Sequence, residues 1–281
     1  MKRRKGFTLQ KRQRWQKEGR GQGHGANYQP QLKIRDVKSH GRSSRLGCPD
    51  TGRSRVTFSN NEYAVLIECR SDPRSGEIQE QKPLELDSTR VIANEMGVRH
   101  PWDRQSGEDI VMTTDILVEL TEAGVSRWVP IPVKPATEMR KPRVLAKLEI
   151  DRRYWERRGW VQHPILDTDI NRTRVANLDF IRNYSVWDRL GIALREPLPA
   201  ARDALIDALL GATKFARAAD VARDIEIRRC WTPGTALALL RHLVASRVLI
   251  ADFEDAMLFD LPASSFIAYP ELALWYSPLL P

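Results

Sequence analysis

The sequence predicts an α/β core, a mixed sheet flanked by helices, followed by a mainly α-helical domain. Residues 113–120 and 126–135 alternate apolar and polar side chains with the period of a half-buried strand, and turn-forming residues at 121–124 separate them. Helix and strand patterns follow one another from residue 59 to residue 166, and helical spacing then dominates. At 281 residues, the chain is long enough for two domains.

The two alternating stretches predict a β-hairpin centred near Gly124 and Val125. Residues whose numbers sum to 249 then face each other, so Asp115 and Lys134 are expected to be cross-strand neighbours on one face. On these residues alone, an acid opposite a lysine is most simply a surface ion pair. The opposite face is expected to turn toward the core with Ile116, Val118, Leu120, Ile131 and Val133.

Five more elements complete the predicted core. Ser59 is a suitable N-cap, and Leu66 and Ile67 follow at helical spacing, so a helix is expected from Ser59 to Arg70. Gly97 is a usual residue after a helix C-terminus. The remaining expectations are a strand over 78–86, a helix over 88–96, a charged helix over 145–158 and a strand over 160–166.

The second domain is predicted to be of the winged-helix type. Its pattern gives helices over 170–187, 200–210, 216–225 and 233–245, then a hairpin of 248–253 and 257–261. Winged helices commonly read DNA, but the third helix of this unit offers few groups for phosphates or base edges. The wing carries acidic residues that DNA repels, so protein binding is the better interpretation: Asp252, Glu254, Asp255 and Asp260.

The final segment, residues 266–281, is aromatic, apolar and nearly uncharged. Two interpretations stand side by side. The segment packs against its own domain, or its Trp, Tyr and Leu residues anchor a partner protein.

The net charge of +9 is unevenly distributed. Residues 1–55 hold 16 Lys and Arg against three acidic residues, whereas the remaining 226 residues hold 29 basic and 33 acidic residues. Clustered basic residues favour a polyphosphate partner such as DNA over a merely solvated tail. The glycine-rich stretch 19–25 lacks the spacing of a nucleotide-binding loop.

Targeting and redox signals are weak. No run is long and apolar enough for a membrane span, and the basic start lacks the apolar stretch of a signal peptide, so a cytoplasmic location is expected. Cys48, Cys69 and Cys230 are scattered, without zinc or disulfide spacing, and are expected to be packing residues.

Eight segments, in order, carry a resemblance to a known family. They are 19–25 (GRGQGHG), 41–43 (GRS), 59–62 (SNNE), 78–84 (IQEQKPL), 97–101 (GVRHP), 113–115 (TTD), 133–136 (VKPA) and 148–155 (LEIDRRYW). Together they resemble the TnsA family, the endonuclease subunit of heteromeric bacterial transposases. The resemblance implies a restriction-endonuclease-like core, in which helix, strands, helix and strand follow in this order.

The resemblance also implies a catalytic site and a set of partners. Glu62 and Asp115 would bind Mg²⁺, for which Mn²⁺ substitutes, with the backbone carbonyl of Val133 as a further ligand. Lys134 would orient the nucleophile and stabilise the transition state. The protein would cut the 5′ ends of a transposon in the cytoplasm, at the nucleoid. Its partners would be a TnsB-type recombinase and a TnsC-type AAA+ ATPase, met through the C-terminal domain and tail.

The expected domains are a DNA-contacting arm (1–55), a catalytic domain (56–167) and a partner-binding domain (168–281). Pro132 stands where the family usually has a polar residue, so the number of metal ions stays open. Ser59 to Glu62 also fits a capping box, a structural role for Glu62. Arg152 and Arg153 are either phosphate contacts or solvated. A stand-alone restriction-like nuclease and an inactive assembly factor remain as alternative functions.

Overall fold

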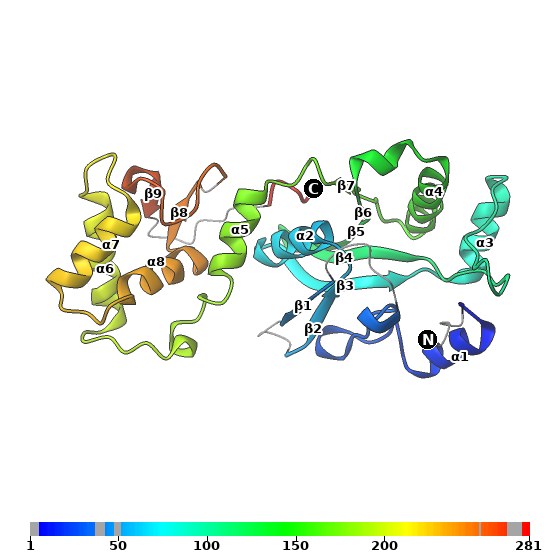
Figure 1. Ribbon diagram of the computed structural model, residues 1–281, viewed down its shortest axis with the longest axis horizontal. Coiled ribbons are helices and arrows are strands. Elements are labelled where there is room, and N and C mark those ends of the chain that lie inside the picture. The colour runs from blue at the N-terminus through cyan, green and yellow to red at the C-terminus, as the bar shows by residue number, and fades with distance from the viewer. Residues whose placement is uncertain (1–5, 37–42, 48–51, 253, 269–276) are drawn as a thin grey trace. The chain divides into compact units, whose positions relative to one another are not determined.

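The computed structural model describes residues 6–36, 43–47, 52–252, 254–268 and 277–281 (Figure 1). The chain divides into two compact units. The first comprises Met1–Ile170 together with Ser277–Pro281, and the second comprises Asn171–Tyr276. The first unit mixes helices and strands, as predicted, and the second is mainly helical.

A three-stranded antiparallel sheet forms the centre of the first unit. Its strands lie in the order β3 (Ser75–Pro83), β4 (Thr113–Glu122) and β5 (Val125–Ile131). A second ladder joins β6 (Val133–Lys134) to β7 (Ile165–Leu166) in parallel. Antiparallel and parallel pairing therefore occur in the same unit, and the predicted strand over 160–166 is shortened to its last two residues.

The predicted hairpin is present, but its register is shifted by two. Glu122 pairs with Val125, so the turn is only Ala123-Gly124, and paired residues sum to 247 rather than 249. Both turn residues have positive φ, of 49° and 80°, which is the requirement of a tight two-residue hairpin turn. The five apolar residues expected to face a core are all at most 5% exposed: Ile116, Val118, Leu120, Ile131 and Val133.

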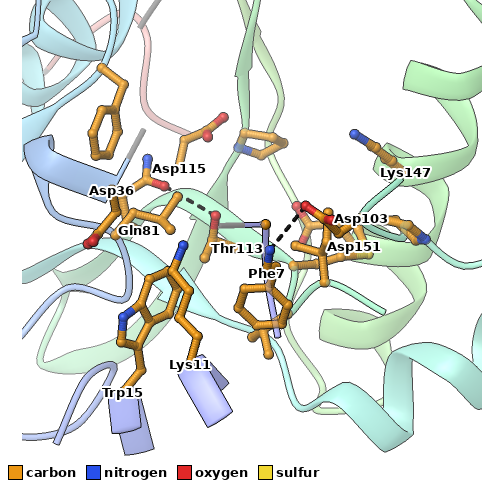
Figure 2. A pocket seen from close by; sticks show the side chains of 18 of the residues that line it. Phe7, Lys11, Trp15, Asp36, Gln81, Asp103, Thr113, Asp115, Lys147 and Asp151 are labelled. Carbon is orange, nitrogen blue, oxygen red and sulfur yellow. Dashed lines mark hydrogen bonds between the residues drawn. The ribbon is translucent and has the colours of Figure 1, made fainter. Parts of the chain in front are cut away.

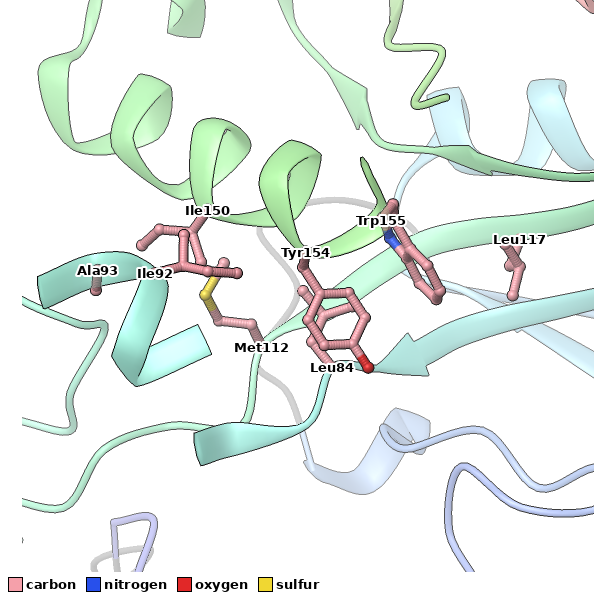
Figure 3. Close-up of a cluster of buried hydrophobic side chains, with 8 residues drawn as sticks. All are labelled: Leu84, Ile92, Ala93, Met112, Leu117, Ile150, Tyr154 and Trp155. Atoms are coloured by element: carbon pink, nitrogen blue, oxygen red, sulfur yellow. The ribbon is translucent and has the colours of Figure 1, made fainter. Parts of the chain in front are cut away.

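Helices flank this sheet. They are α2 (Asn60–Ser71), capped by Ser59 as predicted, α3 (Leu86–Glu95), followed by Gly97 in the left-handed conformation, and α4 (Pro142–Glu156), which a 3-10 turn (Ala136–Arg140) precedes. Figure 3 shows side chains of α3 and α4 meeting Leu117 of β4 in one buried cluster. Leu117 alternates with Ile116 and Val118, so β4 is buried on both faces, and α2 contacts β3 and β4.

The N-terminal residues fold onto the first unit. They form α1 (Leu9–Lys17), 3-10 turns at Gly25–Asn27 and Ile34–Asp36, and a hairpin of β1 (Ser44–Gly47) and β2 (Ser54–Thr57). Trp15 and Tyr28 are almost fully buried, and the Tyr28 hydroxyl donates to the carbonyl of Glu80 at 3.0 Å. The described part of this segment is thus packed structure, and its contact with DNA stays a prediction.

The second unit holds α5 (Arg172–Ile181), a 3-10 turn (Trp187–Leu190), α6 (Leu198–Leu210), α7 (Ala218–Arg228) and α8 (Thr235–Ala245). A short hairpin then pairs β8 (Leu249–Ala251) with β9 (Phe266–Ala268), after a 3-10 turn at Ala263–Ser265. No described helix of either unit has the length and apolar character needed to cross a bilayer.

The predicted partner strand of the second hairpin was wrong. Residues 257–261 are turns, and the strand that pairs with β8 lies at 266–268. The apolar residues Leu258 and Leu261 are nevertheless buried. The backbone N–H of Leu258 donates to the side chain of Asn177 at 2.7 Å, so a side chain takes the place of a ladder bond. The alternating apolar residues of 257–261 therefore reflect a buried turn and not a strand.

The last five residues belong to the first unit. Ser277 donates from its backbone N–H to Asp72 at 2.7 Å and from its hydroxyl to Glu68 at 2.9 Å, and Leu279 and Leu280 are 7% exposed. Arg127 donates to the carbonyl of Pro281 at 2.8 Å. Residues 277–281 are thus packed, but against the first unit and not against the segment's own predicted domain. Residues 269–276 of the predicted tail lie outside the described residues.

Ending the chain after Tyr276 is therefore expected to destabilise the first unit. The truncation removes two buried leucines and two hydrogen bonds of Ser277 to carboxylates, each contributing roughly 1.5–3 kcal/mol. The ordering entropy of five residues, about 1–2 kcal/mol each, offsets most of this, so we expect a net loss of about 2 kcal/mol. This corresponds to a fall in Tm of about 4–8 °C for a domain of this size. Calorimetry of the shortened and full chains measures it. An unchanged Tm would instead favour a tail that is free to dock on a partner.

Candidate active site

One cavity of about 1130 Å³ in the first unit collects the residues predicted to act in catalysis. Glu62, Asp115 and Lys134 all line it, together with Lys147 and Asp151 of α4. The N-terminal segment forms another wall, where Figure 2 shows Lys11 and Trp15 of α1 with Phe7 beside them. The fold thus brings together three elements that are distant in the sequence: α2, the β4–β6 region and α4.

Asp115 and Lys134 form an ion pair with 2.5 Å between Oδ2 and Nζ. Because the hairpin register differs from the prediction, they do not face each other across one ladder. Lys134 lies on β6, beyond the end of β5, and the backbone N–H of Val133 also donates to Asp115 Oδ2 at 2.8 Å. Burial of the ammonium works against its charge, but the Asp115 carboxylate outweighs this and raises the pKa of Lys134.

The carbonyl oxygen of Val133 accepts a hydrogen bond from Lys134 Nζ at 3.1 Å. The lysine ammonium therefore lies between this carbonyl and the Asp115 carboxylate, two oxygen groups that a hard cation also prefers. Pro132 lines the same cavity without a side-chain donor or acceptor, and its carbonyl accepts from the N–H of Ile165 in β7.

Glu62 is both a capping residue and a buried acid. Its Oε1 accepts from the Ser59 hydroxyl at 3.0 Å, and its Oε2 accepts from the backbone N–H of Phe58 at 2.9 Å. The backbone donor predicted for this carboxylate was Ser59, so the donor is displaced by one residue, whereas Ser59 remains the N-cap and its hydroxyl accepts from the N–H of Glu62 at 3.1 Å. Burial, reinforced by the negative charge of Asp115, raises the pKa of Glu62 to about 7.

Asp151 is a residue of the cavity that the sequence interpretation missed. It is 4% exposed, and its carboxylate accepts from the Thr114 hydroxyl at 2.7 Å. Thr114 in turn accepts from the indole N–H of Trp155 at 2.7 Å, and because an indole only donates, the direction of this chain of bonds is fixed. Burial raises the pKa of Asp151 to about 7, and the charge of Asp115 adds to the effect.

The donor set fits a divalent cation. Burial, together with the charge of Asp115, raises the pKa values of Glu62 and Asp151, so their charged forms are unfavourable without a positive partner. A hard cation with oxygen ligands supplies such a partner. In the described part of the chain, no three His, Cys, Asp or Glu side chains gather closely enough to hold a metal by themselves. A cation here therefore also needs the Val133 carbonyl or water.

Several other predicted contacts have structural roles. Arg20 of the glycine-rich stretch is buried, donates to the carbonyl of Gln31 at 3.0 Å and lies over the Trp15 ring. Arg152 and Arg153 are engaged with acidic neighbours on their own helix.

The cysteine prediction was correct only in part. Cys69 is buried, as expected, whereas Cys230 is exposed and has a φ of 52°. Cys230 follows the end of α7, where the chain turns. It is therefore a residue of an exposed turn and not a packing residue. Cys48 lies outside the described residues.

An α/β core that gathers carboxylates and a lysine in one cavity is typical of endonucleases that hydrolyse phosphodiesters. Comparisons with known proteins agree with this class. The family described as TnsA-like endonuclease N terminal matches residues 72–163, and that described as TnsA endonuclease C terminal matches residues 169–253. The chain is 33% identical over 230 residues to the Transposon Tn7 transposition protein TnsA of Escherichia coli, an alignment covering 82% of this chain and 81% of that protein.

The chain therefore belongs to the TnsA family, and it is a DNA endonuclease. Asp115, Lys134 and Asp151 fall inside the N-terminal match, whereas Glu62 precedes it. The assignment of Glu62 consequently depends on the cavity and on the segment 59–62.

Proposed function

We propose that this protein is the endonuclease subunit of a cut-and-paste DNA transposon and hydrolyses phosphodiester bonds at the 5′ ends of the element. The observation that carries the proposal is the convergence of Glu62, Asp115 and Lys134 on one cavity of a TnsA-family chain. A separate TnsB-type recombinase would then process the 3′ ends.

The proposed mechanism is hydrolysis assisted by Mg²⁺, for which Mn²⁺ substitutes. Glu62, Asp115 and the Val133 carbonyl would hold the cation, whose chemical contribution when bound would be to polarise the phosphate and to make water a stronger nucleophile. Asp115 also fixes Lys134 through the 2.5 Å ion pair, so the ammonium is positioned before the substrate arrives. From there Lys134 orients the attacking water and offsets the negative charge that develops on the phosphate.

Asp151 is proposed as a positioning residue. Burial raises the pKa of Asp151 to about 7, so its carboxyl group exchanges a proton near neutral pH, and a cation bound nearby would favour its charged form. Hydrogen bonds join Asp151 of α4 to Thr114 of β4, and Thr114 to Trp155 of α4. The charge of Asp151 therefore acts on both elements. Asp151 thereby helps to set the charge that Asp115 and Lys134 experience.

The second unit, Asn171–Tyr276, lies within the predicted partner-binding domain 168–281 and would bind the partner recombinase and a TnsC-type AAA+ ATPase. Helices α6, α7 and α8 followed by the β8–β9 hairpin support a winged-helix-like interpretation. Three acids lie between the two strands of that hairpin, and all three are exposed, which disfavours DNA: Asp252, Glu254 and Asp255. The protein would be associated with the nucleoid only because its DNA substrate lies there.

A nicking assay tests the proposed function. Transposon-end DNA is incubated with the protein and Mg²⁺, with and without the partner subunits, and cuts are mapped on each strand. Cleavage restricted to the 5′ ends and dependent on Asp115 supports the proposal. Cutting of arbitrary DNA by the protein alone would favour the stand-alone nuclease, and full end cleavage by Asp115→Ala assemblies would favour the inactive assembly factor.

The N-terminal segment is expected to bind DNA through the face that reaches the cavity. Lys11, Arg14 and Arg35 line it, so replacing Lys11 and Arg14 by alanine should weaken DNA binding and flatten its dependence on salt. Deleting residues 1–40 would also remove the buried Trp15 and Tyr28, so point substitutions are the sharper test. Fluorescence anisotropy over a salt series measures the slope. A slope equal to that of the unaltered protein would show that the segment has only a structural role.

A further inference from the structure

Helix α4 has two halves of different electrostatic character. In its C-terminal half, Arg152 contacts Glu149 at 2.8 Å and Glu156 at 3.1 Å, and Arg153 contacts Glu149 at 2.6 Å. These arginines are neutralised within the helix. In the N-terminal half, Arg143 and Lys147 have no acidic side chain bonded to them among the described residues. The near-balanced charge of residues 56–281 therefore conceals a local basic face.

Lys147 is the residue of this face that reaches the active-site cavity. Figure 2 shows its side chain extending from α4 on the side of the cavity opposite Lys11. Partial burial lowers the pKa of Lys147, and the positive charges of Arg143 and Lys134 lower it further. These positive charges repel one another, so binding of an anion among them is favourable.

Arg143 is held in place by backbone carbonyls rather than by an acid. Its Nη1 donates to the carbonyl of Arg99 at 2.8 Å, and its Nη2 lies 3.5 Å from the carbonyl of His100. A guanidinium has five N–H donors, so donors remain for a ligand. The residue is exposed, whereas Lys141 on the same turn is already paired with Glu138 at 2.9 Å.

We propose that Arg143 and Lys147 form a phosphate-binding face for the DNA strand that enters the active site. The proposal rests on the proposed function. Lys147 shares the cavity with Asp115 and Lys134, so a strand whose scissile phosphate lies at Lys134 carries a neighbouring phosphate past Lys147 and on toward Arg143. Lys11 and Arg14 line the other wall of the cavity, and the strand therefore passes between two basic walls.

Binding of a short end-DNA duplex in EDTA, over a series of salt concentrations, tests this face. Lys147→Ala and Arg143→Ala are each expected to reduce the slope of log K against log salt by about 0.9, the value for one lost phosphate contact. Arg152→Ala and Arg153→Ala are the matched controls, since each removes one positive charge from the same helix. Their slopes should stay close to that of the unaltered protein.

Equal slopes in Lys147→Ala, Arg143→Ala and the unaltered protein would overturn the inference. An equal reduction in all four variants, or no salt-dependent DNA binding by the unaltered protein, would overturn it as well. Folding is checked by Tm, which should not fall in Lys147→Ala because the substitution removes charge repulsion. Cleavage of end DNA by the unaltered protein assembly is scored separately, so failure of the proposed function is distinguished from failure of this face.

Discussion

Glu62→Gln is expected to keep the thermal stability of the protein and to lose Mg²⁺-dependent cleavage by about 10²- to 10³-fold or more. The two roles of Glu62 make this separation possible. Its carboxylate accepts hydrogen bonds from Phe58 and Ser59, and an amide oxygen still accepts such a bond. A neutral amide, however, lacks the charge that holds a hard divalent cation.

Glu62→Ala is the comparison that isolates the cap. It removes both the hydrogen-bond acceptor and the charge, and loss of a capping interaction costs roughly 1 kcal/mol, so its Tm should fall while that of Glu62→Gln does not. Asp115→Ala and Lys134→Ala should match the cleavage loss of Glu62→Gln. Calorimetry and the nicking assay are run on the same preparations. Full cleavage by Glu62→Gln, with instability confined to Glu62→Ala, would leave Glu62 as a cap only.

The hairpin shows what local patterns predict and where they stop. Alternation identified both strands and their buried face, because a period of two is a property of a few consecutive residues. The register depends on how many residues the turn uses. Ala123 and Gly124 both adopt positive φ, which closes the turn in two residues and shifts every pair. Asp115 and Lys134 still meet, but through β6, whose pairing with β7 no local pattern indicates.

Asp151 shows the same limit for long-range contacts. Its hydrogen-bond partner Thr114 is 37 residues away, so burial of its carboxylate cannot be read from neighbouring residues. A signal was nevertheless present. Asp151 lies three residues after Leu148 and four before Trp155, both buried, which places a charged residue on the apolar stripe of α4. An acid at such a position is a candidate for a functional role.

The basic N-terminal segment was interpreted from its charge, and charge does not report packing. Its Trp15 and Tyr28 are buried, and Arg20 is enclosed with Asp36 and Glu18. Aromatic residues spaced along a basic segment were the available signal, since a merely solvated tail has little use for them. The segment forms part of the wall of the candidate active site, where Lys11, Arg14 and Arg35 line the cavity.

Asp151→Asn is expected to remove a large part of the pH dependence of stability in the absence of divalent cations. The pKa of Asp151 is raised to about 7 in the folded protein, so the folded state binds this proton more tightly than the unfolded chain does. Stability then falls as pH rises from about 4 through about 7. Asparagine keeps the acceptor for the Thr114 hydroxyl and carries no charge, so the variant should be more stable at pH 8 by an amount on the order of 3 kcal/mol.

Tm measured from pH 5 to pH 8.5 in EDTA compares Asp151→Asn with the unaltered protein. Asp87→Asn is the control, because Asp87 is an exposed acid on α3 and its loss should leave the slope unchanged. At pH 5, where Asp151 is protonated, the Tm of Asp151→Asn should approach that of the unaltered protein. A variant that is less stable than the unaltered protein at pH 8, with an unchanged slope, would show that Asp151 is stabilised as a carboxylate and that its role is structural.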